Sequence, residues 1–288
     1  MKHRTSCIAL SLLLVLCVAS HIAAEEIAVD AIYYPPASTG KDIAILFLGG
    51  SEGGYPRFNY ESFTQAGYPC MGLAYFGTEN TPERLHEIPL EYFEEALRVF
   101  SEKPEVQGKQ LIVYGGSKGG ELALLLASRF PLIEGVIAKV PSSVVFQGIG
   151  TDSSSWSHKG APIPFVLCVP ATQRIANNAY VDVYRQSLLQ HEAVERATIP
   201  VEQINGPVLL LSAKQDTMWP STQMCESVMA RLKDYGFKFS YEHHAYEEAG
   251  HLLTEGYSWG GGTDSGNQRA RLDFQEKIFT YLGQLAEK

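Results

Sequence analysis

The stretch of sequence that decides the fold is LIVYGGSKGGELALLLA, residues 111–127. It begins with an apolar run typical of a buried strand, passes through four glycines and ends in an apolar helical pattern. At its centre, Gly115, Ser117 and Gly119 form the pattern G-x-S-x-G. Between a strand and a helix, this pattern indicates a sharp turn that raises a serine hydroxyl above the end of a sheet. We therefore interpret Ser117 as a nucleophile; the alternative is a glycine-rich turn with an incidental serine.

Short apolar runs alternate with amphipathic helical patterns along most of the chain. The runs lie at 43–48, 71–75, 111–114, 135–138 and 208–211, and the helical patterns lie near 57–66, 88–102, 118–129, 221–235 and 269–285. The runs are continuously apolar, as strands covered on both faces are. The alternation predicts an α/β fold in which helices cover both faces of a mostly parallel sheet.

Two stretches break this rhythm. Residues 142–205 are rich in Ser, Gly and Pro at their start and show no clear strand. Ordinary long connections could explain them, but their place between two strands predicts a lid-like insertion over the carboxyl edge of the sheet, where ligands bind in such folds. We expect the second irregular stretch, 256–266, to border the same site.

The first 24 residues have the features of a secretory signal peptide. Lys2 and Arg4 precede an apolar run at 8–18 that is too short to span a bilayer, and small residues follow up to Ala24. We expect cleavage after Ala24, a secreted or periplasmic protein and one domain over residues 25–288. The alternatives are an uncleaved membrane anchor and a lipoprotein signal, the latter disfavoured because a leucine precedes Cys17.

The composition excludes several classes of partner. The formal net charge is −9, which argues against nucleic acid and anionic membrane surfaces. No later apolar run approaches the length of a membrane span, so no stable membrane insertion is expected after cleavage. Beyond the signal lie Cys70, Cys168 and Cys225, an odd number without zinc spacing. We expect mostly buried thiols, no metal and no cofactor; the disulfide pairing and the oligomeric state stay open.

A serine hydroxyl needs a base, and the base needs an acid that fixes its tautomer. Asp216 lies in the turn after the apolar run at 208–213, although it could instead cap the next helix. His251 lies in the loop beyond a predicted strand at 239–244. We predict Ser117, Asp216 and His251 as a catalytic triad, in the chain order typical of α/β-hydrolases. A metal site formed by His251 with the nearby His243 and His244 is an alternative, but their spacing matches no metal-binding motif.

The loop GGSEGG, residues 49–54, follows the first parallel strand and predicts one half of an oxyanion hole. We expect the backbone N–H groups of Ser51 and Lys118 to be its two donors. Gly50, Glu52 and Trp219 are expected to contact the substrate. A phosphate-binding loop is the alternative, but the sequence has no G-x-G-x-x-G pattern, and Glu52 would repel an anion.

In this order, several motifs resemble the C-terminal catalytic domain of the acyl-CoA thioesterase and bile acid-CoA:amino acid N-acyltransferase family. They are LGGSEGG at 48–54, EIPLEYF at 87–93, GSKGGE at 116–121, DTMWPS at 216–221, AGH at 249–251 and WGG at 259–261. The resemblance runs from about residue 41 to residue 282. It implies an α/β-hydrolase fold with Ser117, Asp216 and His251 as the triad, the same residues reached above.

Two departures from the family bear on function. Longer members carry an N-terminal β-sandwich, for which the residues before 41 are too few. The family's amidating branch uses a cysteine nucleophile, so Ser117 favours water as the acceptor. We therefore expect an exported serine hydrolase that cleaves a small-molecule acyl ester or thioester. The alternatives are peptidase activity, acyl transfer to an amine, and a non-catalytic binding protein on a hydrolase scaffold.

Overall fold

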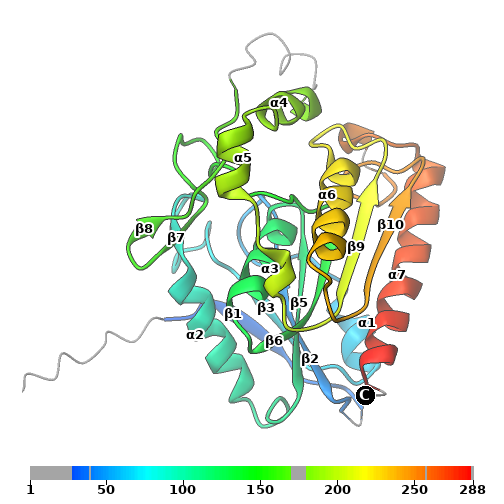
Figure 1. The fold of residues 1–288 in the computed structure, drawn as a ribbon. Coiled ribbons are helices and arrows are strands. Elements are labelled where there is room, and N and C mark those ends of the chain that lie inside the picture. The colour runs from blue at the N-terminus through cyan, green and yellow to red at the C-terminus, as the bar shows by residue number, and fades with distance from the viewer. Residues whose placement is uncertain (1–27, 39, 170–179, 257, 287–288) are drawn as a thin grey trace, which may run out of the picture.

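The computed structural model describes residues 28–38, 40–169, 180–256 and 258–286, and its centre is a seven-stranded sheet (Figure 1). The strand order is β1-β3-β2-β5-β6-β9-β10. The strands are β1 (Ala31–Tyr34), β2 (Ile43–Leu48), β3 (Cys70–Leu73), β5 (Gln110–Gly116), β6 (Ile133–Lys139), β9 (Val208–Ala213) and β10 (Tyr241–Tyr246). Strand β1 pairs antiparallel with β3, and the other six strands are parallel. The predicted α/β architecture is confirmed.

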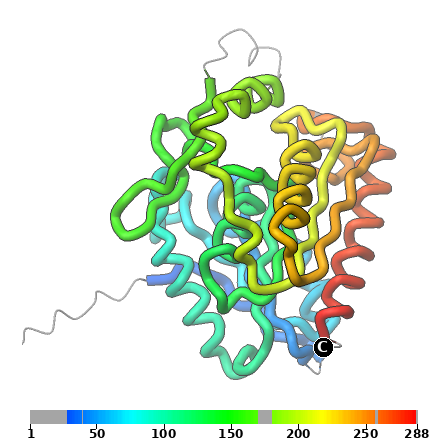
Figure 2. The backbone as a smooth tube through the Cα atoms, viewed as in Figure 1, coloured from blue at the N-terminus to red at the C-terminus, as the bar shows by residue number. Residues whose placement is uncertain are grey.

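Helices cover both faces of this sheet, as Figures 1 and 2 show. They are α1 (Tyr60–Gln65), α2 (Leu90–Ser101), α3 (Lys118–Arg129), α6 (Ser221–Asp234) and α7 (Asp264–Ala286). Side chains of a strand alternate between its faces. In β2, Ala44, Leu46 and Leu48 therefore join the core under α2, α3 and α6, and the residues between them join the core under α1 and α7. Both faces of the strand are buried, which explains its continuous apolar run.

The segment 142–205 carries several short elements. They are β7 (Trp156–His158), β8 (Ala161–Pro162), α4 (Tyr180–Ser187), α5 (His191–Ala197) and a 3-10 turn at Val201–Gln203. Helices α4 and α5 lie beyond the end of the sheet toward which β9 runs (Figure 1). A separate apolar cluster, which includes Phe146, Val166 and Trp219, packs this segment against the start of α6. The segment therefore borders the carboxyl edge of the sheet.

The sequence interpretation differs from the structure at several places. It found no strand within 142–205, but β7 pairs with β4 (Ile88–Pro89) and β8 in a small sheet of three strands. It also omitted the edge strand β1. Such short strands exist because distant segments pair with them, a contact that local pattern does not reveal.

The helix boundaries in the structure also differ from the predicted ones. Helix α1 begins after Asn59, whose side chain accepts a hydrogen bond from the backbone N–H of Ser62. The last helix begins at Asp264, a turn earlier than expected. The amphipathic helical pattern near 88–102 is confirmed in α2, because one face of this helix is buried, with Tyr92, Phe93, Ala96, Leu97 and Phe100.

The structure bears on the predictions about cysteines and membrane spans, but only within the residues that it describes. Cys70 and Cys225 are buried free thiols, and Cys168 is a half-buried one. The predicted signal peptide lies outside the described residues. Within the part of the chain that the structure describes, none of the helices combines the length and apolar character that crossing a bilayer requires.

Candidate active site

Ser117 occupies the turn between β5 and α3, and its backbone is strained. Its φ is +56° and its ψ is −122°, a conformation that a residue with a Cβ rarely adopts. The turn is held because the Ser117 N–H donates to the carbonyl oxygen of Lys139 at 2.9 Å, on the neighbouring strand β6. The strain therefore presents the side chain at the carboxyl edge of the sheet, as the G-x-S-x-G pattern predicts.

Glycines let the turn fit between the strands. A Cβ at Gly119 would lie 2.5 Å from the carbonyl oxygen of Leu48 and closer still to that of Gly49. A Cβ at Gly115 would collide with the backbone of Gly119. The first turn of α3 is thus pressed against the end of β2, which brings the glycine-rich loop after β2 beside Ser117.

The three residues predicted as a triad form a continuous chain of hydrogen bonds. The Nε2 atom of His251 lies 2.8 Å from the Oγ atom of Ser117, and its Nδ1 atom lies 2.8 Å from Oδ2 of Asp216. A carboxylate only accepts hydrogen bonds, so Nδ1–H is the donor to Asp216. Nε2 then carries the lone pair and accepts the hydroxyl proton of Ser117. This is the arrangement of a general base oriented by a buried acid.

The carboxylate of Asp216 is itself fixed in place. Its Oδ1 accepts from the backbone N–H groups of Met218 and Trp219, at 2.9 and 3.2 Å. Its Oδ2 accepts from the hydroxyl of Ser221 at 2.7 Å as well as from His251. The alternative interpretation of Asp216 as a helix cap is wrong, because both of these backbone donors lie in the turn before α6, whose N-cap is Pro220 without a side-chain cap bond. Sequence reasoning missed Ser221, the first residue of α6.

His251 is anchored from the backbone. Its N–H donates to the carbonyl oxygen of Gly260 at 2.8 Å, and the N–H of Gly250 donates to the side chain of Asn267 at 2.8 Å. The edge of the Trp219 indole faces the imidazole, with ring centroids 5.8 Å apart. The loop 256–266 therefore positions the histidine, and the exposed Trp259 from this loop also lines the cavity described next.

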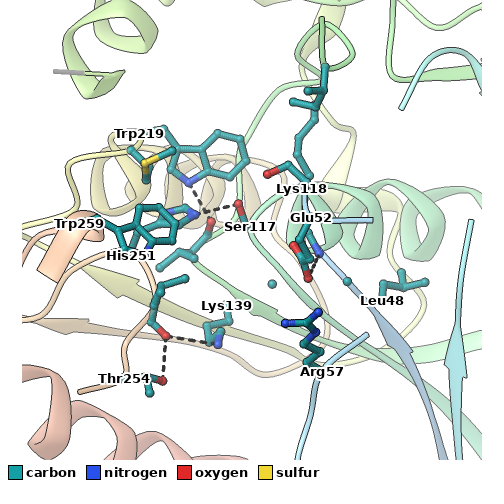
Figure 3. Close-up of a pocket in the computed structure, with 18 of the residues that line it drawn as sticks. Leu48, Glu52, Arg57, Ser117, Lys118, Lys139, Trp219, His251, Thr254 and Trp259 are labelled. Carbon is teal, nitrogen blue, oxygen red and sulfur yellow. Dashed lines mark hydrogen bonds between the residues drawn. The ribbon is translucent and has the colours of Figure 1, made fainter. Parts of the chain in front are cut away.

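A cavity of about 450 Å³ opens over Ser117 and His251 (Figure 3). Its wall includes every predicted oxyanion and substrate-contact residue, namely Gly50, Ser51, Glu52, Lys118 and Trp219. The segment 142–205 contributes Ile149 and Tyr184. The site thus joins a hydroxyl, an oriented imidazole and a cavity large enough for a small organic substrate.

Two backbone donors face this region. Within the described residues, neither Ser51 N–H nor Lys118 N–H donates a hydrogen bond to the protein. The neighbouring Gly50 N–H, by contrast, is taken by the carboxylate of Glu52 at 3.0 Å. A Cβ on Gly50 would lie 3.3 Å from that of Ser117, so this loop closely approaches the nucleophile. Ser51 and Lys118 remain available to an oxyanion.

The side chain of Lys118 belongs to a buried polar network. Its ammonium contacts both carboxylate oxygens of Glu121, at 2.9 and 3.0 Å, and the carbonyl oxygen of Phe146. Glu121 also accepts from the indole N–H of Trp156 at 2.9 Å and the backbone N–H of Phe146. Burial lowers the pKa of Lys118 and raises the pKa of Glu121, because desolvation penalises both charged forms. The network ties the start of α3 to the segment 142–205.

We expect Lys118→Met to destabilise the fold by about 3–5 kcal/mol, because it leaves the carboxylate of Glu121 buried without its cation. The double variant Lys118→Met/Glu121→Gln should recover most of that loss. The glutamine removes the charge and keeps an acceptor for Trp156. Chemical denaturation of the three proteins measures both effects; equal instability of the single and double variants would contradict this account of the pair.

The other histidine candidates lie elsewhere. His243 and His244 are neighbours in β10; the first contacts the hydroxyl of Ser212 at 2.8 Å and the second contacts Glu242. Neither lines the cavity. In the described part of the chain, no three His, Cys, Asp or Glu side chains gather in the way a metal site needs.

Sequence reasoning missed two cations in the cavity wall, Arg57 and Lys139. Lys139 is the last residue of β6, directly beside the nucleophile turn. A polar residue at the carboxyl end of a predicted parallel strand was the available signal. Arg57 lies in the irregular stretch before α1, which has no pattern that marks it.

The sheet topology, the nucleophile turn and the Ser117–His251–Asp216 hydrogen bonds together define the class as an α/β-hydrolase. Residues 88–260 match the family described as "BAAT / Acyl-CoA thioester hydrolase C terminal". The chain belongs to this family, and the resemblance inferred from the sequence motifs is confirmed.

Curated relatives agree with this assignment. Acyl-coenzyme A thioesterase 1 of Rattus norvegicus is 30% identical over 230 residues, covering 80% of this chain and 53% of the relative. The mitochondrial acyl-coenzyme A thioesterase 2 of Mus musculus is 29% identical, covering 80% of this chain and 49% of the relative. The chain therefore spans about half the length of these relatives.

Solved structures support the fold. An acylaminoacyl peptidase from Pyrococcus horikoshii superposes with a TM-score of 0.54 at 17% identity, covering 86% of this chain and 39% of that one. An α/β hydrolase from a deep-sea metagenome library also has a TM-score of 0.54, at 15% identity, and covers 86% of both chains. These likenesses establish the architecture, which places the chain among α/β-hydrolases.

Proposed function

We propose that this protein is a serine hydrolase that cleaves small-molecule acyl esters or thioesters through an acyl-enzyme intermediate. The observation that carries the proposal is the pair of 2.8 Å contacts that join Ser117 to His251 and His251 to Asp216 at the wall of a cavity. Family membership supports the same chemistry, since its description names an acyl-CoA thioester hydrolase.

In the proposed reaction, Ser117 Oγ attacks the acyl carbonyl carbon as His251 Nε2 takes the hydroxyl proton. Asp216 holds the imidazole and stabilises its positive charge. The backbone N–H groups of Ser51 and Lys118 donate to the oxyanion. The bond to the leaving alcohol or thiol then breaks, and His251 returns the proton to that group.

Water completes the cycle. His251 removes a proton from a water molecule, which attacks the acyl-enzyme carbonyl. As the second oxyanion collapses, the bond from the acyl carbon to Ser117 Oγ breaks, His251 returns the proton to Oγ, and the carboxylic acid is released. The nucleophile is a serine and not the cysteine of the family's amidating branch, which favours water over an amine acceptor. Burial of His251 and Asp216 beneath the cavity wall strengthens their mutual attraction.

The test compares one acyl group on three leaving groups. Butyryl p-nitrophenyl ester, butyryl-coenzyme A and butyryl p-nitroanilide are offered to the wild-type protein, with Ser117→Ala protein as the blank. We expect ester or thioester turnover that depends on Ser117. Turnover that persists in the variant would contradict the proposal, and cleavage of the anilide alone would reassign the protein as a peptidase. Added glycine in the same assay would reveal acyl transfer as an amide product.

We further propose that the protein is exported, because residues 1–24 combine a positive start, a short apolar run and a small-residue cleavage site. Expression of the full chain with an N-terminal analysis of the product tests this. The expected mature N-terminus is Glu25, and an intact Met1 on protein that stays within the cell would contradict it.

A further inference from the structure

Besides Lys118, whose ammonium is paired with Glu121, two cations share the cavity with the nucleophile, and the proposed mechanism uses neither. Arg57 and Lys139 line the cavity over Ser117 and also a second, adjoining cavity of about 150 Å³. In Figure 3 both side chains lie on the same side of Ser117, with Glu52 between Arg57 and the nucleophile turn. Since both residues line both cavities, they stand where the two meet.

Within the part of the chain that the structure describes, no carboxylate lies at ion-pair distance from Lys139, although Glu52 attracts its ammonium from farther away. Its carbon chain passes Gly116, where an added Cβ would lie 3.3 Å from Lys139 Cε. Among the described residues, its ammonium contacts the carbonyl oxygen of Leu252, at 3.5 Å, and the ring of Phe274, with 5.6 Å to the centroid. Desolvation lowers the pKa of Lys139. Glu52 offsets only part of this desolvation, and a partly buried ammonium without an ion-pair partner is costly, so an anion that arrives there gains a strong partner.

Arg57 is equally unengaged. Among the residues that the structure describes, its guanidinium forms no ion pair and no hydrogen bond. A guanidinium presents a planar fork of donors that matches carboxylate and phosphate oxygens. By contrast, Arg271, which also lines the second cavity, is held by Glu255 at 2.8 Å.

One carboxylate in the cavity walls, that of Glu52, attracts the Lys139 ammonium but forms no ion pair with either cation. Glu52 is the sole acidic side chain among the described residues that line the two cavities. Its carboxylate bonds to the backbone N–H of Gly50 and lies outside ion-pair distance of Arg57 and Lys139. Among the described residues of the two cavity walls, two cations without an ion-pair partner therefore face one carboxylate, within a protein whose net charge is −9. Because the protein as a whole is acidic, an anion is attracted to this positive site and not to the protein surface in general.

We propose that Arg57 and Lys139 form a subsite for an anionic group of the substrate, a carboxylate or a phosphate, next to the acyl carbonyl that Ser117 attacks. This inference rests on the proposed function and narrows its substrate class to charged acyl compounds. The anion could come from the far end of the acyl group or from the leaving group. Both sources would present anionic oxygen atoms to the two cations, and matched substrates distinguish one source from the other.

The experiment measures kcat/KM for two pairs of substrates. In the first pair, the p-nitrophenyl esters carry either a butyryl group or a glutaryl group with a free carboxylate. In the second, the butyryl thioester is formed either with coenzyme A or with N-acetylcysteamine, which has no phosphate. The wild-type protein should favour the charged member of at least one pair by about tenfold or more, because a charge-assisted contact contributes on that scale.

Variants locate the preference. Arg57→Gln and Lys139→Met should each reduce the charged-to-neutral ratio of the responding pair about tenfold while neutral-ester turnover changes much less. Lys238→Met, on an exposed residue away from the cavities, removes the same charge from the whole protein and should leave the ratio unchanged. A ratio that neither cavity variant alters, or that Lys238→Met alters equally, would overturn the subsite.

Binding separates failure of the subsite from failure of the proposed function. Ser117-dependent turnover of the neutral ester tests the function by itself. If no substrate turns over, titration calorimetry on Ser117→Ala protein measures the binding of glutarate and of free coenzyme A. At least one should bind, and Lys139→Met in that background should weaken it about tenfold. Absence of binding by both, or binding that the variant leaves intact, would refute the subsite.

Discussion

Ser117→Ala protein is expected to fold normally and to lose at least about 10³-fold in kcat, because the triad acts as a unit and only oxyanion and binding contributions remain. The substitution keeps the Cβ and therefore the backbone strain of the turn. It removes only the hydroxyl that contacts His251 Nε2 at 2.8 Å. Steady-state turnover of the best ester or thioester measures the loss.

A second substitution at this position separates strain from chemistry. Ser117 has a φ of +56°, which glycine adopts without the cost that a Cβ imposes. Ser117→Gly should therefore be as inactive as Ser117→Ala and more stable than it by about 1 kcal/mol. Ser128→Ala, in the helix that follows Ser117 and away from the cavity, is the matched control and should retain activity. An active Ser117→Ala protein, or an alanine variant as stable as the glycine one, would contradict the respective half of this prediction.

Gly119→Ala is expected to destabilise the protein by about 3 kcal/mol or more, the upper range for overpacking a rigid contact. Its Cβ would press on the carbonyl oxygens of Leu48 and Gly49, which are backbone atoms at the end of β2 and cannot rotate away. The helix start must then shift, and it carries Ser117 and the N–H of Lys118 with it. We expect a fall in Tm of about 6–12 °C together with a loss of turnover.

Gly283→Ala is the matched control for this variant. Gly283 lies inside α7, and an added Cβ there would meet no atom within 4 Å. Alanine is the better helix former by about 1 kcal/mol, so this variant should be slightly more stable than the wild type. Thermal unfolding of the two alanine variants makes the comparison. Similar melting temperatures for both would show that α3 is not wedged against β2 as described.

Local pattern predicted the parts of the fold that repeat along the chain. The continuous apolar runs marked the buried strands, and the glycines around Ser117 marked the turn, because both depend on neighbours in sequence. Chain order and strand ends placed Asp216 and His251 within reach of Ser117, and the structure brings all three into contact. Their catalytic role stays a prediction.

The same local patterns could not predict contacts between segments that are distant in sequence. Glu121 meets the indole of Trp156, 35 residues away, and nothing near either residue signals the pairing. The pairing of β4 with β7 joins Ile88 to Trp156 in the same way. Arg57 became visible as part of the site only when its loop was placed beside β6. The sequence therefore indicates the candidate catalytic residues, whereas the residues that line the cavity are determined by tertiary packing.

Ser221 illustrates the boundary between these two kinds of information. The motif DTMWPS placed it close to Asp216 in sequence, yet its hydroxyl could have pointed in any direction. In the structure it begins α6 and donates to Asp216 Oδ2 at 2.7 Å, beside the contact from His251. The acid of the triad is thus held by its own turn and by the next helix, a detail that fixes the imidazole and could not be derived from spacing.

The most direct test of the central claim is covalent labelling of the nucleophile. A neutral fluorophosphonate reacts with a serine only where a base activates it and an oxyanion hole receives the phosphoryl oxygen. Wild-type protein is incubated with the probe, and the modified peptide is identified by mass spectrometry. The account predicts one adduct, on Ser117, that is absent from Ser117→Ala protein and greatly slowed in His251→Ala protein. Unlabelled wild-type protein, or an adduct on another residue, would contradict it.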